Sequence, residues 1–155
     1  ANAYFLPGIR FRHALMHAAQ RGVRVTILLQ GRMEYLLQHY ASQALFDALL
    51  GAGIRIFEYH LSFLHAKVAV IDGQWATVGS SNIDPFSLLL AREANVIIED
   101  HRFAHQLRAS LKTAIAQEST PVTAASKHIY SWHSYILNWF SFYIVRIMQG
   151  LLGYE

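Results

Sequence analysis

The chain has 155 residues, of which 54% are hydrophobic and only 15% are charged, and its formal net charge at pH 7 is +3. Soluble domains usually contain about 25% charged residues, so we expect part of the surface to be covered by a partner half or by a membrane. The absence of cysteine excludes disulfide bonds and thiolate chemistry. The mild positive charge suits an anionic lipid or a nucleic acid and does not decide between them.

The first part of the chain alternates strand-like and helix-like patterns. Residues 3–6, 23–29 and 54–58 are apolar or alternate apolar with polar positions, which predicts strands. Residues 10–21 and 34–50 carry apolar side chains at helical spacing. Each of these two runs is followed by a glycine, which predicts that the helices end there.

The second part contains a predicted hairpin. Residues 67–71 form a short β-branched run, an Asp-Gly turn signal follows, and residues 75–78 return as a second strand. A further strand is predicted at 93–99 and a helix at 102–117. The predicted fold class is therefore α/β, with a mixed or mainly parallel sheet flanked by helices.

The most informative stretch lies on this hairpin and follows the pattern H-x-K-x4-D-x6-G-S-x-N. Side chains two apart on a strand share a face, so His65 and Lys67 are expected to point the same way. Ser80 and Asn82 are expected to do so beyond the second strand. A lone H-x-K would be noise in a chain with nine histidines, but chance does not explain the whole pattern in this strand context.

These groups suit transfer of a phosphoryl group without a metal. Lys67 supplies a point charge for phosphate, and Ser80 and Asn82 supply hydrogen bonds. A neutral His65 supplies a nucleophile or a proton donor. Glu93 could accept a hydrogen bond from one nitrogen of the His65 ring and so fix its tautomer. The alternative for Glu93 is an ordinary buried partner of an arginine.

At these residues the sequence resembles the HKD signature of the phospholipase D superfamily. Residues 76–88, together with 2–8 and 93–98, resemble bacterial cardiolipin synthases, closest to the cardiolipin synthase B type. The resemblance implies a phospholipase D-like half, a phosphohistidine intermediate, and no metal or cofactor. The site residues that it implies are catalytic His65, Lys67, Asp72 and Glu93, and phosphate-binding Lys67, Ser80 and Asn82. Asp72 directly follows a strand, so we expect it to support the turn rather than to transfer a proton.

Members of this superfamily use two such motifs, one in each half of a bilobal molecule or one from each subunit of a dimer. This chain carries one motif. We therefore expect a second HKD-bearing half as a partner, and we interpret the chain as the C-terminal half of a longer enzyme. A complete single-motif subunit that pairs its sites by dimerising is the alternative.

The C-terminal region differs in composition. Residues 1–118 are expected to form the catalytic half, 119–127 a linker, and 128–155 an amphipathic helix with a thin polar stripe. This helix is apolar nearly all round, with Arg146 as its one permanent charge before the last residue. Its many tryptophan and tyrosine rings favour a position in a membrane interface, and packing on the catalytic half is the alternative.

Two other groups of residues have weaker interpretations. Four arginines near the start could form a patch for anionic lipid, although such charges usually form a solvated face: Arg10, Arg12, Arg21 and Arg24. Two histidine pairs at i, i+4 spacing could bind a metal ion on a helix. These pairs are His13/His17 and His101/His105. Neither pair has a third ligand near it in the sequence, so solvated or capping histidines are favoured.

The function implied by the resemblance is phosphatidyl transfer between phospholipids, with cardiolipin made from phosphatidylglycerol. Such a phosphatidyltransferase would lie peripherally on the bacterial inner membrane, and its partners would be an anionic phospholipid substrate and the membrane surface. Nucleic acid is not expected as a partner. Two alternatives stay open: a homodimeric single-motif phosphodiesterase or nuclease of the same superfamily, and a non-catalytic membrane-binding module.

Overall fold

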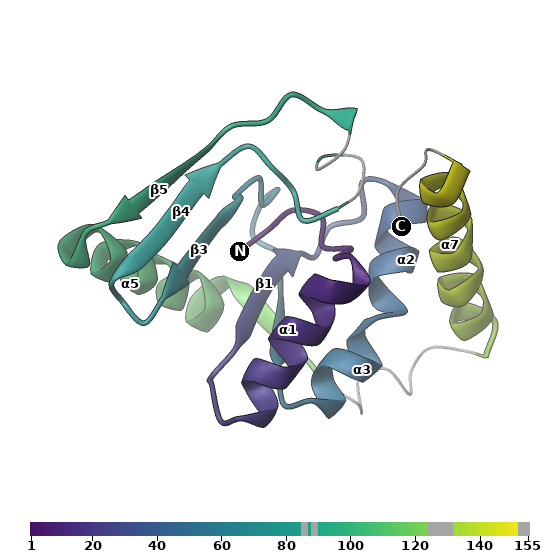
Figure 1. Ribbon diagram of the computed structural model, residues 1–155. Helices are drawn as coiled ribbons and strands as arrows, with labels where there is room; N and C mark the ends of the chain where they lie inside the picture. The colour runs from purple at the N-terminus through teal and green to yellow at the C-terminus, as the bar shows by residue number, and fades with distance from the viewer. Residues whose placement is uncertain (85–86, 88–89, 124–131, 152–155) are drawn as a thin grey trace. The chain divides into compact units, whose positions relative to one another are not determined.

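The computed structural model describes residues 1–84, 87, 90–123 and 132–151. Helices and strands alternate through much of this part of the chain (Figure 1). The elements, in chain order, are α1 (Ile9–Gln20), β1 (Thr26–Gln30), α2 (Leu36–Gln43), α3 (Phe46–Gly51), β2 (Arg55–Tyr59), β3 (Val68–Ile71), β4 (Trp75–Gly79), β5 (Asn95–Glu99), α5 (His101–Glu118), β6 (Ser119–Val122) and α7 (Trp132–Leu151).

The chain divides into two compact units. Unit 1 consists of Ala1–Phe5, Ile27–Arg32 and Phe57–Pro121, and it contains α5, the whole of β3, β4 and β5, and most of β1, β2 and β6. Unit 2 consists of Leu6–Thr26, Met33–Ile56 and Val122–Glu155, and it contains α1, α2, α3 and α7.

Two three-stranded sheets in the order β1-β2-β6 and β3-β4-β5 are joined by the first residues of the chain. Asn2 forms a parallel bridge with Leu29 of β1 and an antiparallel bridge with Lys67, next to β3. The Ala1 N-terminus donates to Val68 O at 2.8 Å, and Val68 N donates back to Ala1 O. In space, β6, β2 and β1 are therefore followed by residues 1–3, and these residues are followed by β3, β4 and β5.

The sheet is mixed, as the sequence predicts. Gly31 N donates to Tyr59 O, and Arg55 N donates to Val25 O, so β1 and β2 run in the same direction. Parallel neighbours need a crossover connection, which α2 and α3 supply. The strands β3, β4 and β5 are antiparallel, as their paired registers show.

The buried side chains of unit 1 lie along β1 and where α5 packs on β3, β4 and β5. Ile27, Leu28 and Leu29 are buried in succession along β1, which is typical of a strand covered on both faces. The helix α5 packs on β3, β4 and β5, and lies along one face of them in Figure 1. Ala76 on β4 and Ala104 on α5 are fully buried, and small side chains of this kind allow a helix to approach a sheet closely.

Unit 2 is helical, and α7 packs along α2 within it. The sequence predicts one helix over residues 34–50, but the structure divides it into α2 and α3. At the division Leu45 N donates to Ser42 O at 3.0 Å, an i to i−3 bond that tightens the backbone. This tighter turn buries Leu45 and Phe46 together in the core of the unit.

Two further expectations change. The predicted strand at 3–6 is reduced to isolated bridges at Asn2 and Phe5. Part of the predicted linker at 119–127 is the strand β6, because Ser119–Val122 pairs with β2 at the edge of the sheet. The rest of that linker after residue 123 lies outside the described residues, as do residues 128–131 and 152–155 of the predicted C-terminal segment. Among the helices of the described residues, none combines the length and the apolar character needed to cross a bilayer.

Candidate active site

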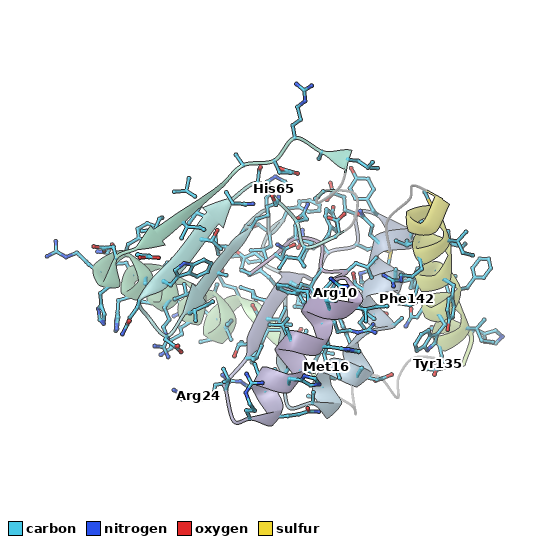
Figure 2. The ribbon with its side chains drawn as sticks, viewed as in Figure 1. Arg10, Met16, Arg24, His65, Tyr135 and Phe142 are labelled. Carbon is cyan, nitrogen blue, oxygen red and sulfur yellow. The ribbon has the colours of Figure 1, made fainter. Side chains whose placement is uncertain are left out.

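The motif residues other than Asp72 meet at the end of the sheet where β3 begins and β4 ends. His65 and Lys67 directly precede β3, and Gly79 closes β4. Gly79 N donates to Lys67 O at 3.0 Å, so the two parts of the motif lie side by side. Figure 2 shows His65 at this end of the sheet, away from the turn that joins β3 to β4.

The Lys67 ammonium lies against the His65 ring. Lys67 Nζ is 3.0 Å from Nδ1 and 2.9 Å from Nε2 of that ring, and it donates to His65 O at 3.1 Å. The Lys67 side chain is only 6% exposed, whereas His65 is exposed. An ammonium only donates hydrogen bonds, so its contact with the ring uses a nitrogen lone pair. The site thus offers solvent an imidazole backed by a buried positive charge.

Ser80 and Ser81 extend the pairing of β4 with β5 beyond the strands. Ser80 N donates to Ala94 O at 3.0 Å, and Ala94 N donates to Ser80 Oγ at 3.0 Å. The Ser80 hydroxyl donates to Ala94 O at 3.4 Å, which occupies its single hydrogen. Asn95 Nδ2 donates to Ser81 Oγ at 2.7 Å. These bonds bring the segment that carries Glu93 alongside the motif.

Asn82 begins a short polar network. Its Nδ2 donates to Ser87 Oγ at 3.3 Å, and Ser87 in turn donates to Asp84 through Oγ at 2.9 Å and through its backbone N at 3.0 Å. Asp84 is 2% exposed. Within the part of the chain that the structure describes, Asn82 Oδ1 is buried and has no hydrogen-bond partner. An amide nitrogen carries two hydrogens, and the bond to Ser87 uses one of them.

The structure does not bring two predicted site residues to His65. Asp72 is exposed at the turn, with a left-handed φ of 53° that Asp tolerates better than most residues. The length of β3, roughly 15 Å, separates it from Lys67, because an extended chain rises about 3.3 Å per residue. Glu93 is half-buried before β5, and among the described residues no hydrogen bond joins it to His65.

An arginine that sequence reasoning missed fixes the segment before His65. Arg32 Nε donates to His60 O at 3.0 Å, and Arg32 Nη2 donates to Leu61 O at 2.7 Å. Its guanidinium lies 5.7 Å from the centre of the Phe63 ring. His60 Nε2 is also 2.9 Å from Thr120 Oγ1. No motif marks Arg32, because its partners are backbone carbonyls nearly thirty residues further along the chain.

Metal ligation has little support in this part of the chain. The described residues contain no group of three or more histidine, cysteine or acidic side chains that could hold a metal ion. The two predicted histidine pairs do adjoin on their helices. The rings of His13 and His17 are 6.2 Å apart and those of His101 and His105 are 4.7 Å apart, and both pairs are stacked.

Comparison with known proteins identifies the family. A family model described as cardiolipin synthase, phospholipase D-like domain, matches residues 1–115. The chain belongs to this family. It is 42% identical to cardiolipin synthase B of Escherichia coli (strain K12) over 154 residues, which are 99% of this chain and 37% of that protein. The chain therefore spans little more than a third of the length of the curated relatives that it matches.

Two solved structures share the fold. A phospholipase D family member, Nuc, from Salmonella typhimurium has a TM-score of 0.67 at 22% identity, with 79% of each chain covered. A phosphatidylserine synthase from Haemophilus influenzae Rd KW20 has a TM-score of 0.65 at 13% identity, with 88% of this chain and 36% of that one covered. At these identities the likeness concerns the fold alone. The predicted phospholipase D-like fold is confirmed.

Proposed function

We propose that the protein is a phosphatidyltransferase that makes cardiolipin from two molecules of phosphatidylglycerol on the surface of the bacterial inner membrane. Membership of the family supports the reaction class. The observation that carries the proposal is the buried Lys67 ammonium within 3.0 Å of the exposed His65 ring. A fixed cation beside a nucleophile suits a phosphodiester, whose two free oxygens carry the negative charge.

Lys67 has two tasks in this proposal. A phosphate oxygen that enters beside His65 takes over the hydrogen bond that Lys67 Nζ now gives to the ring. The ring then regains the lone pair that a nucleophile or base needs, while the ammonium neutralises the phosphate. Substrate binding and activation of His65 thus occur in one exchange of hydrogen bonds.

The reaction uses a pair of histidines, His65 and one from a second HKD-bearing half in the same protein or in a dimer mate. One histidine attacks phosphorus to form an N–P bond, and the other protonates the departing glycerol oxygen. The same second histidine then removes the proton from the free hydroxyl of another phosphatidylglycerol, which attacks phosphorus and releases the first histidine. Two phosphatidylglycerols give one cardiolipin and one glycerol, and exclusion of water favours this outcome over hydrolysis.

The remaining predicted ligands would contribute unequally. Asn82 could give its remaining amide hydrogen to a phosphate oxygen. Ser80 would have to exchange its 3.4 Å bond to Ala94 O for one to the substrate. Glu93 would orient His65 through a hydrogen bond that the described residues do not show.

Labelled phosphatidylglycerol, incubated with the complete protein, tests the proposal. Loss of His65 as nucleophile or acid should lower cardiolipin formation by a factor of about 10⁴ or more in His65→Ala. Lys67→Met should lower it by about 10²–10³, the usual cost of one charge-stabilising group. His101→Ala removes an exposed histidine on α5 and serves as the matched control. Unchanged turnover in His65→Ala would overturn the proposal, and cleavage of DNA in place of lipid would favour the phosphodiesterase alternative.

A further inference from the structure

The helix α7 is amphipathic in the reverse of the usual sense. Its buried side chains include Asn138 and Ser141, at 7% and 3% exposure, together with Val145 at 0%. A surface helix of a soluble domain normally buries its apolar stripe and presents its polar one to water. Here the polar stripe that the sequence shows is on the inner side, and it faces the unit in which α7 packs along α2.

The opposite side of α7 is apolar and exposed. We call it the outer face, and its five side chains are 54–62% exposed: Tyr135, Ile136, Phe140, Tyr143 and Ile147. At 100° per residue, most of these positions lie opposite the buried ones. A shallow groove on this face is lined by Trp139 together with four of the same residues. Tyrosine and tryptophan have an apolar ring and a polar tip, which suits the boundary between lipid and water.

The charge of unit 2 points to the occupant of this face. By sequence, unit 2 contains seven lysines or arginines and three acidic residues. Unit 1 contains six lysines or arginines and seven acidic residues. The helix α1 has no acidic residue, and Arg10 and Arg24, labelled in Figure 2, are exposed. Desolvation and the positive charge of Arg146 on α7 lower the pKa of Arg12 on α1. Arg12 of α1 and Arg146 of α7 therefore lie near enough for their charges to interact, and unit 2 as a whole has a surplus of cations.

We propose that unit 2 docks on an anionic phospholipid membrane, with the outer face of α7 seated in the interface and the positive charge of the unit favouring anionic headgroups. An apolar stripe with aromatic rings and flanking cations is the composition of helices that lie in the membrane plane. A second copy or another protein half would cover the same apolar face, but neither calls for a surplus of cations. The docking surface does not depend on the chemistry at His65.

Vesicle flotation with the complete protein tests this surface without any turnover. The wild type should bind vesicles of phosphatidylcholine with phosphatidylglycerol, and should bind pure phosphatidylcholine vesicles much more weakly. Phe140→Ser with Tyr143→Ser should weaken binding by about tenfold or more, since two apolar side chains leave the interface. Arg10→Gln with Arg24→Gln should weaken binding to the anionic vesicles about fivefold or more and make it less sensitive to salt.

Ile97→Ser is the matched control, because Ile97 on β5 is as exposed as Phe140, at 62%, but belongs to unit 1. It should bind vesicles like the wild type. All the substituted side chains are exposed, so the variants should fold, and quenching of tryptophan fluorescence by brominated lipid reports insertion in the wild type itself. Equal binding of the wild type and the Phe140→Ser/Tyr143→Ser variant would overturn the proposal. A change of oligomeric state in that variant, without a change in vesicle binding, would assign the face to a protein partner instead.

Discussion

Replacing Gly79 by alanine tests how closely β4 and β5 must approach beside the site. Gly79 pairs with Asn95 across the antiparallel ladder. A Cβ atom at Gly79 would lie 2.5 Å from Ala94 O and would collide with the Asn95 side-chain oxygen. The Asn95 side chain can rotate away, but the carbonyl belongs to the backbone and moves only if the two strands separate.

We expect Gly79→Ala to lower the free energy of unfolding by about 1–3 kcal/mol, the usual cost of an overpacked position. Separation of the strands would also strain the bond from Gly79 N to Lys67 O, which is 3.0 Å long. Lys67 would then shift relative to the His65 ring. Cardiolipin formation should therefore fall even under conditions where the variant stays folded.

Urea unfolding followed by circular dichroism measures the effect. The control is Gly51→Ala, because Gly51 ends α3 and a Cβ there meets nothing within 4 Å. That substitution should leave stability unchanged or raise it by up to about 1 kcal/mol, since alanine has less freedom to lose on folding. Equal midpoints for the two variants would refute the reasoning. If the double variant Gly79→Ala/Asn95→Ala regained the stability of the wild type, the destabilisation of Gly79→Ala would come from the Asn95 side chain alone and not from the Ala94 carbonyl.

Three other predictions concern side chains around the sheet and the motif. Burial raises the pKa of the Glu58 carboxyl above its ordinary 4.5. The contribution of Glu58 to the free energy of unfolding is therefore complete below its unfolded pKa and is lost as pH rises through its folded pKa. Glu58→Gln should flatten this fall in the free energy of unfolding, measured by urea unfolding at a series of pH values. Asp84→Ala removes the acceptor of two bonds from Ser87 and should lower the unfolding free energy by about 1 kcal/mol, seen as a lower Tm. Arg32→Met should lower kcat about tenfold at nearly constant KM, because the segment before His65 loses two bonds. Arg102→Met, at an exposed arginine on α5, should leave kcat unchanged. An equal fall in kcat in both variants would contradict a positioning role for Arg32.

The hairpin and its motif could be predicted because their signals are local. A β-branched run, an Asp-Gly turn and a returning strand specify antiparallel neighbours within fifteen residues. Spacing of two along a strand then brings His65 and Lys67 to the same side. The division of the helix at Leu45 carries no such signal, since alanine and leucine suit a continuous helix. It follows from burial of Leu45 and Phe46 in unit 2.

By itself the sequence determined the class of the fold, the mixed sheet and the pairing of an imidazole with an ammonium, because each depends on periodicity or on neighbours close in the chain. Only the tertiary structure decided which side of α7 is buried, because an apolar helix with a polar stripe can pack either way and the contact with α2 selects one. It also decided that Asp72 lies far from His65 while Arg32 lies close to the segment before it. Distances of this kind depend on the order in which strands pair within a sheet, and local sequence patterns do not determine that order.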